Sequence, residues 1–486
     1  MSESTRIMTS GELKSSSGKL SGTLGVTSIV LMVVATAAPL TVMVANTPLI
    51  ISMGNGAAAP FDAIIATAIM LLFTIGFVAM SKYITNAGAF YAYVQKGLGR
   101  IIGLGSASTA LVSYSLILFA LEAYIGYSLA EFLSSFFSIS IPWQIMSFVV
   151  VAIIGFLGYR HIELSSKFLA VALVLEILIV LLVDAAILYR QGVPADAFTA
   201  FSPATISSGS PGLGIMFAIY CFIGFEATVI FREEARDPER TIPLATYIAV
   251  LLVGLFYTLS MWCEVIGVGV QEVLQFANAH PADMYLLITE NYLNRAFVDV
   301  MQVLLITSLF ACILSLHNIV VRYQYVMGRY GVLSNRLSGV HQRHASPHAS
   351  SLVQTLTSLG MLAILMLIGL DPVTQIYAWG ATAGTLGYML ILSLTCISVL
   401  VFFQRNKVDR RLWNVVIAPA GGLAGILICL WIAVDNLPSL VGGDNAHGVS
   451  IALETIVLLT FIAGIACALY MKACRPVHYQ RLKELA

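Results

Sequence analysis

The sequence predicts an all-α integral membrane protein with twelve transmembrane helices: two successive five-helix units of inverted topology, followed by two further helices. Three observations predict this fold class, namely an apolar composition, twelve long apolar segments, and helix interruptions at matching places in the two units. Of the 486 residues, 59% are hydrophobic and 10% are charged, whereas a soluble protein carries about 25% charged residues. The lipid bilayer is therefore expected to be the main solvent of the chain.

Twelve segments are apolar enough to cross a bilayer, which takes roughly 20 apolar residues. They lie near residues 25–51, 60–81, 101–134, 142–159, 165–189, 212–231, 243–268, 297–327, 352–370, 373–403, 413–435 and 449–473. Cytoplasmic loops are enriched in Lys and Arg. With the N-terminus inside, all 25 basic residues except Arg190 and Arg295 fall on the cytoplasmic side. We therefore expect both termini in the cytoplasm and the protein in the plasma membrane.

The spans divide the chain into five expected parts. These are a cytoplasmic N-terminal tail at 1–23, the first five-helix repeat at 24–190, the second repeat at 211–403, helices eleven and twelve at 404–474, and a cytoplasmic C-terminal tail at 475–486. Because five is odd, the second repeat starts on the opposite side of the membrane from the first. The two repeats are therefore expected to be inverted with respect to each other.

Two spans contain residues that interrupt a helix. The first reads "VVATAAPLTVMVANTP", and because proline removes an intrahelical hydrogen bond, a break is expected around Ala35–Pro39. The sixth reads "YCFIGFE", with a weak point around Tyr220–Gly224. Either feature alone could be a simple kink. Together, at matching positions in two halves, they are the best sequence indication of a transporter binding site, since unpaired backbone groups persist in a membrane only beside a cavity or ligand.

Charge, cysteine and motif content argue against other classes of protein. The formal net charge is zero, whereas nucleic-acid binding needs a basic patch. The seven cysteines are scattered singly without a CxxC pair, so neither a disulfide scaffold nor a zinc site is expected. The stretch "HQRHASPH" at 341–348 lacks metal-ligand spacing and is expected to be a cytoplasmic loop. No Walker-type loop for ATP is present, and no cofactor or metal is expected.

Three separated stretches carry a family resemblance. "FIGFEA" followed by "EEARDPERTIPLA" lies on the sixth span, "MSKYITNAGAFYAYVQKGLGR" at 80–100, and "HNIVVRYQYVMGRYGVLSNRLSGVH" at 317–341. In this order, on these spans, they resemble the amino acid–polyamine–organocation (APC) permease superfamily over roughly residues 20–410. One departure is the first break, which reads Ala-Thr-Ala-Ala-Pro here, whereas the family usually has a glycine-rich element there.

The resemblance implies a LeuT-type inverted-repeat fold, with discontinuous first and sixth helices, that works by alternating access. In that family the substrate's carboxylate meets backbone amides at the first break, and its amine meets carbonyls where the helices unwind. Partial charges at helix ends explain how a zwitterion is held there without a charged side chain. By position, the implied substrate-binding residues are Ala35, Thr36, Ala37, Ala38, Tyr220, Phe222 and Gly224.

Three of the glutamates inside the spans are candidate functional residues, because a charge there costs at least about 2.5–3.5 kcal/mol. Glu226 follows the sixth break and is expected to be either a protonatable coupling group or a cap that closes the inner gate. Glu176 stands where some proton-coupled relatives have a lysine, and is a candidate proton carrier or cation ligand. Glu122 matches a third-span glutamate near the substrate in some relatives. For Glu122 and Glu176 the alternative is a protonated acid that hydrogen-bonds a neighbouring helix.

Weaker candidates lie on the eighth and tenth spans. His317 and Asn318 are candidate coupling or gating residues, since histidine titrates near neutral pH, although a lone intramembrane histidine is as often a helix-helix hydrogen bonder. Ser308 and Ser315 could supply oxygen ligands to sodium, but serine is also a common packing residue in membranes. Tyr377 and Trp379 could form an outer gate or anchor the helix at the interface.

These observations together predict a secondary active transporter of amino acids or related organic amines, with a proton as the coupling ion. The open alternative is a sodium-coupled or exchange-type carrier of polyamines or other organocations. A channel would need continuous charged pore-lining faces. A membrane enzyme would need a His/Asp or Ser/His cluster at one surface, and the sequence contains none. The acidic residues in the middle of the spans have no basic counterpart there, which predicts neutral or cationic cargo rather than glutamate or aspartate.

Overall fold

The structure is a computed structural model that describes residues 25–84, 89–160, 166–230, 235–341, 346–442 and 445–482. Helices follow one another through these ranges, which contain no β-strand. Within them, ten helical stretches are long and apolar enough to cross a membrane, by length and composition. The prediction of an all-α protein with many spans is confirmed. The expected N-terminal tail at 1–23 and residues 342–345 of the histidine-rich loop lie outside the described residues.

The long helices are joined by short connections. They are α4 (Ala59–Ser81), α6 (Arg100–Phe137), α7 (Trp143–Arg160), α8 (Ser166–Gln191), α12 (Pro238–Val268), α15 (Arg295–Arg329), α16 (His348–Ile368), α17 (Ala378–Asn406), α18 (Ala418–Val441) and α19 (Ala446–Cys474). Two π-helical turns, η7 (Pro372–Tyr377) and η8 (Trp413–Ile417), lead into α17 and α18. Shorter helices lie in the connections, among them α5 (Ala89–Leu98), α13 (Val273–Ala279) and α14 (Met284–Tyr292).

The ten stretches differ from the twelve expected spans at two places. The first stretch, Val26–Ser81, is 56 residues long, which is more than one crossing needs. It leaves helical geometry at Gly54 (φ −99°, ψ −112°) and Gly56 (φ 57°). The expected sixth span is divided into α10 (Pro211–Tyr220) and α11 (Ala227–Ile230), each too short to cross alone. The count of twelve therefore stays a prediction.

The first span is interrupted where the sequence predicts. Helix α1 (Val26–Thr36) ends before Ala37, and α2 (Pro39–Thr41) begins with Pro39 in its first turn. Between them Ala38 has a left-handed conformation (φ 48°, ψ 67°), which is uncommon for any residue other than glycine. The chain then continues through the π-helical turn η1 (Val42–Asn46), α3 (Thr47–Leu49) and the π-helical turn η2 (Ile50–Asn55).

The sixth span is interrupted over residues 221–226, which form consecutive turns between α10 and α11. Gly224 has φ 105°, a conformation that side chains disfavour. A Cβ atom on Gly224 would lie 2.7 Å from Thr36 Cγ2. Glycine at this position therefore lets the sixth-span break lie directly against the end of α1.

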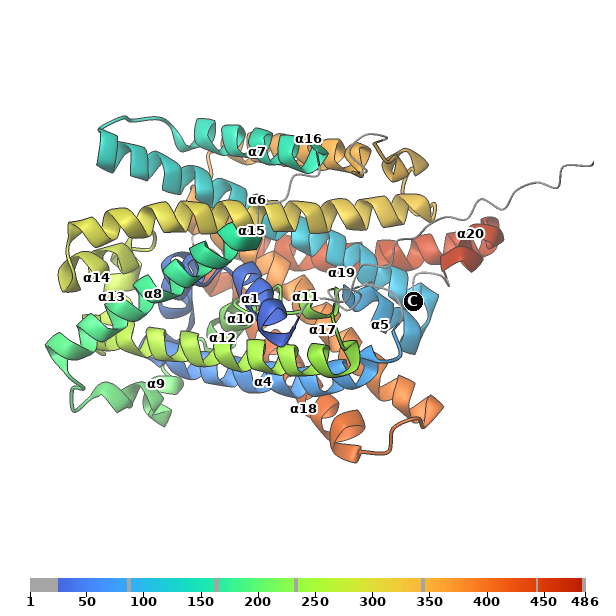
Figure 1. Ribbon diagram of the computed structural model, residues 1–486, viewed down its shortest axis with the longest axis horizontal. Helices are drawn as coiled ribbons and strands as arrows, with labels where there is room; N and C mark the ends of the chain where they lie inside the picture. The colour runs from blue at the N-terminus through green and yellow to red at the C-terminus, as the bar shows by residue number, and fades with distance from the viewer. Residues whose placement is uncertain are drawn as a thin grey trace, which may run out of the picture.

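The interrupted helices lie inside the bundle. In Figure 1 the labels of α1, α10 and α11 lie in the middle of the molecule, while α7 and α16 form one edge and α18 the opposite edge. All residues of α10 from Gly212 to Tyr220 are buried. The outer helices expose leucine, isoleucine and tryptophan, for example Leu255 at 68%, Leu367 at 88% and Trp431 at 72%. Such surfaces suit contact with lipid.

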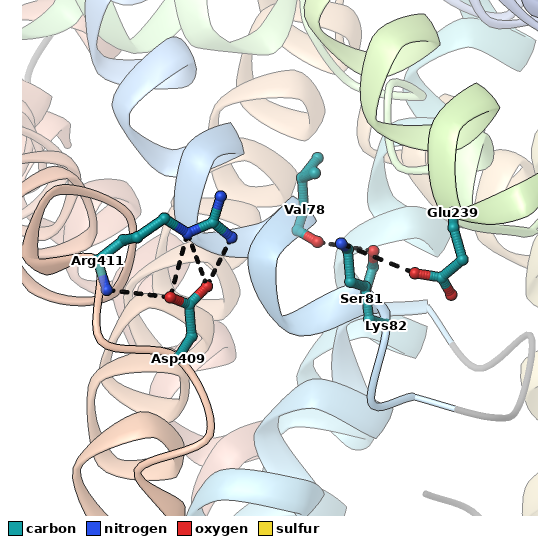
Figure 2. A network of polar contacts seen from close by, with 6 residues as sticks. All are labelled: Val78, Ser81, Lys82, Glu239, Asp409 and Arg411. Carbon is teal, nitrogen blue, oxygen red and sulfur yellow. Dashed lines mark hydrogen bonds and ion pairs between the residues drawn. The ribbon is translucent and has the colours of Figure 1, made fainter.

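Two ion pairs lie close together where α4 ends and α12 begins (Figure 2). Lys82 Nζ is 3.8 Å from Glu239 Oε2, and Arg411 Nη2 is 2.7 Å from Asp409 Oδ2. Hydrogen bonds from Arg411 lower the pKa of Asp409 to about 2. Exposed pairs of this kind contribute little to stability. The Lys82–Glu239 pair connects the end of α4 to the start of α12; residues 231–234, which precede α12, lie outside the described residues.

Candidate functional site

A small cavity lies where the two helix breaks meet. Its volume is about 40 Å³, and its walls come from the α1–α2 junction, α6, the α10–α11 break and α15. Of the residues predicted from the sequence, it is lined by Thr36, Ala37, Ala38, Tyr220, Gly224 and Glu226. The remaining wall includes aliphatic side chains, among them Ile117, Leu121 and Leu316. The two interruptions therefore contribute to one small, mostly apolar site.

The other predicted residues lie outside this wall. Ala35 precedes it on α1 and packs against the core, and Phe222 is 2% exposed within the sixth-span break. Asn318 lines a different cavity of about 220 Å³ beside Gly158 and Arg322. His317 Nε2 is 3.1 Å from Ser351 Oγ of α16, a contact that fits the helix-helix hydrogen bond considered as its alternative role.

Glu226 closes the sixth-span break. Its carboxylate accepts hydrogen bonds from the hydroxyls of Tyr114 on α6 and Tyr388 on α17, the latter at 3.4 Å, and from the Gly224 backbone N–H at 3.0 Å. The side chain is 3% exposed. Among the described residues that line the cavity, it is the only acidic one. Glu226 thus joins three elements at the break and presents a carboxylate to the cavity.

Glu176 lies on the other side of the first-span break. Its Oε2 accepts a hydrogen bond from Ser308 Oγ at 2.8 Å, and Thr41 Oγ1 donates to Ser308 Oγ at 3.3 Å. The carboxylate also accepts from the backbone N–H of Leu40 in the first turn of α2. A free N–H group at a helix start attracts negative charge. The structure therefore brings together Glu176 and Ser308, which are candidates for proton and sodium coupling respectively.

Glu122 does not line the cavity, although its neighbour Leu121 does. It is fully buried, and neither carboxylate oxygen has a hydrogen-bond partner. Its polar neighbour is Ser358 on α16. Glu122 therefore lies between α6 and the peripheral α16. The acid that lines the cavity is Glu226.

These features, two broken helices around a small cavity inside a helical bundle, are accompanied by a family match. A family model described as "Amino acid permease" matches residues 28–473. The chain belongs to the amino acid permease family. This confirms the resemblance to the APC superfamily, and it makes the chain a multi-pass membrane transport protein rather than an enzyme.

Two relatives of the permease differ in what their names say they transport. The chain is 24% identical over 219 residues to the branched-chain amino acid permease BcaP of Bacillus subtilis; the match spans 44% of this chain and 43% of that protein. It is 22% identical over 386 residues to the low-affinity putrescine importer PlaP of Escherichia coli K12, spanning 77% of this chain and 80% of that protein. The Bacillus match thus covers less than half of the relative's length.

Sequence reasoning found Tyr220 but missed three other tyrosines of the permease site. Tyr114 and Tyr388 hold Glu226, and the Tyr257 hydroxyl donates to the Ala37 carbonyl at 3.4 Å. All three are buried in the middle of long helices. Membrane tyrosines are enriched at the two interfaces, so a tyrosine near the centre of a span indicates a buried polar partner. That signal was available in the sequence.

Proposed function

We propose that the permease is a secondary active transporter that moves amino acids or related organic amines by alternating access. The observation that supports it most is the small cavity between the two helix breaks. Breaks expose backbone groups that need a partner in a membrane. At about 40 Å³ the cavity holds no more than a few water molecules. An amino acid is larger, so binding requires the surrounding helices to move, as alternating access does.

The full architecture that we propose has twelve spans in a LeuT-type arrangement of two inverted five-helix repeats plus two helices. In this reading, residues 24–190 and 211–403 are the repeats, and the stretch Val26–Ser81 contains two spans that reverse at Gly54–Gly56. The divided sixth helix supplies the remaining span. The supporting observation is that the sixth-span break at Gly224 lies directly against Thr36, where α1 ends, so that the two interruptions meet.

For the substrate we propose a neutral or cationic amine rather than an acidic amino acid. Glu226 would repel a carboxylate side chain, and charges act strongly where screening by water is poor. The aliphatic wall formed by Ile117, Leu121 and Leu316 suits an alkyl chain. The names of the two relatives, which cite branched-chain amino acids and putrescine, are consistent with both properties. Backbone groups around Ala37 and Ala38 would bind the α-amino or carboxylate group.

Coupling to protons through Glu176 is the mechanism that we propose for energy input. The Glu176 carboxylate accepts hydrogen bonds from the first-turn N–H of α2 and from Ser308. These hydrogen bonds change when the carboxylate takes up a proton. Protonation would weaken its hold on the first-span break. The competing candidate is sodium, for which Thr41, Ser308 and Glu176 would supply oxygen ligands.

Proteoliposomes with purified permease test the function. Labelled leucine and labelled putrescine are supplied outside vesicles that contain either buffer or unlabelled substrate. A carrier gives saturable uptake that is accelerated by internal substrate, and uptake driven by an inward pH gradient persists when choline replaces sodium. Uptake that rises linearly with concentration and ignores internal substrate would instead indicate a channel. Strict dependence on sodium would replace the proton by sodium in the proposed mechanism.

A further inference from the structure

A second group of buried acids lies away from the central cavity, where α8, α12 and α14 pack together. Asp184 of α8 is 4% exposed and Glu264 of α12 is fully buried. Tyr285 of α14 is fully buried beside them, and the charges of both acids act on its hydroxyl. None of these residues lines the cavity between the helix breaks.

Helix geometry places the three side chains on facing surfaces. Ser260 Oγ donates to Asp184 Oδ2 at 2.7 Å, and Glu264 follows Ser260 by one turn on the same face of α12, about 5–6 Å away between Cβ atoms. Tyr285 shares a face of α14 with Tyr292, two turns further on. The Tyr292 hydroxyl donates to the Gly267 carbonyl of α12 at 2.6 Å. That face of α14 therefore points toward α12.

The oxygens of this group lack hydrogen-bond partners. Asp184 Oδ1, both Glu264 carboxylate oxygens and the Tyr285 hydroxyl are buried, and none bonds to another or to any described group. A buried polar group without a partner costs roughly 1–3 kcal/mol, and a charged one costs more. Four oxygen atoms contributed by α8, α12 and α14 are therefore available to a ligand.

No described basic side chain neutralises the two acids. Arg190 of α8 is exposed and donates to the Asn291 carbonyl at 2.8 Å. Arg295 of α15 is paired with Glu290 at 3.6 Å and Asp299 at 3.2 Å. The last turn of α12 contains no basic residue. Both acids therefore lack a basic partner among the described residues of the helices packed around them.

We propose that Asp184, Glu264 and Tyr285, supported by Ser260, bind a hard divalent cation, with calcium as the best match. Carboxylate and hydroxyl oxygens are the ligands such ions prefer, and calcium takes about 6–8 oxygens in flexible geometry. A divalent ion balances both carboxylates, whereas a monovalent ion leaves one charge buried. The described residues contain no cluster of three or more His, Cys, Asp or Glu that could hold a metal, so the ligand set is two acids completed by hydroxyls.

A cation bound at this site would have a structural consequence, because the site lies between three helices. It joins the connecting helix α14 to two spanning helices, α8 and α12, near the ends at which Gln191 and Val268 terminate them. The proposal departs from the sequence-based expectation that no metal is bound. It does not depend on the proposed transport function, since binding is measured without substrate.

Equilibrium binding of radioactive calcium to the full-length, detergent-purified permease tests the proposal after treatment with a chelator. The expected result is one saturable site per chain with a Kd at or below about 1 mM, as in weak extracellular calcium modules. Asp184→Asn and Glu264→Gln should each abolish it, and Tyr285→Phe should weaken it several-fold. The matched control is Glu122→Gln, which removes another fully buried carboxylate without a partner and should bind like wild type.

Several results would overturn the proposal. Absence of saturable calcium binding to the wild type would show that protons neutralise the acids. Displacement of calcium by sodium at equal concentration would reject the divalent ion. Equal loss of binding in Glu122→Gln would show that the effect is not local. Should an acid variant fail to fold, the wild-type stoichiometry and the mild Tyr285→Phe variant still decide the outcome. As a second readout, calcium should raise the unfolding temperature of the wild type but not of Glu264→Gln.

Discussion

Single residues at the two helix breaks decide whether the cavity can form. Gly224 is the clearest case, because its φ of 105° and its contact with Thr36 leave no room for a side chain. Gly224→Ala should lower the free energy of unfolding by about 1–3 kcal/mol and weaken substrate binding. The control is Gly360→Ala in α16, where an added Cβ meets no atom within 4 Å. Thermal unfolding with and without substrate measures both effects; equal behaviour of the two variants would contradict the packing described.

The carboxylate of Glu226 provides a second test at this scale. Glu226→Gln should weaken binding of a cationic amine about tenfold more than binding of a neutral amino acid, or about 1.4 kcal/mol. Competition against one labelled substrate measures the difference. Equal weakening of both substrate types would mean that Glu226 does not face the cargo.

Tyr114→Phe should reduce stability by removing a donor to a buried acid, whereas Tyr470→Phe on the exposed face of α19 should not.

The surface pair Asp409–Arg411 supplies a prediction about pH. The folded pKa of Asp409, about 2, lies below its ordinary value of 3.8. The stabilisation by the pair is therefore fully present above pH 4 and is lost as pH falls through about 2. Asp409→Asn should leave the pH profile of transport between about pH 5 and 8 unchanged. A shifted profile in this variant would locate part of the pH response at this surface pair.

At the scale of helices, the sequence predicts the interruptions better than the orientation of the helices. Pro39 lacks an N–H and Gly224 lacks a side chain, so each break can be located from local chemistry. Helix α6 is apolar around most of its circumference, and its periodicity does not reveal which face meets the cavity. Leu121 therefore lies in the cavity wall while the adjacent Glu122 faces α16. The Tyr114–Glu226 contact joins residues 112 positions apart, which no local pattern predicts.

Coupling between elements leads to a prediction about Glu176. This side chain links α8 to the start of α2 and, through Ser308, to α15. Glu176→Gln mimics the protonated acid, so it should remove accumulation driven by a pH gradient but keep exchange of internal for external substrate. Both quantities are measured in the same proteoliposomes. Full pH-driven accumulation by this variant would exclude Glu176 as the proton carrier, and a sodium requirement that disappears in Ser308→Ala would favour the sodium alternative.

At the scale of the whole molecule, composition and length predict the all-α membrane class correctly, since 59% hydrophobic residues cannot be accommodated in a soluble domain of this size. The number of spans is harder to predict from the sequence. Helices long enough to cross number ten among the described residues. In the twelve-span architecture that we propose, a reversal at Gly54–Gly56 and the divided helix α10–α11 would supply the other two spans.

The central claim is that substrate binds between the two breaks of one permease bundle. A structure determined with bound leucine or putrescine tests it most directly. The account predicts substrate in contact with Ala37–Ala38 on one side and Tyr220–Gly224 on the other, with both helices still interrupted and the cavity enlarged beyond its present volume of about 40 Å³. Substrate bound elsewhere, or first and sixth helices that run unbroken past it, would contradict the account.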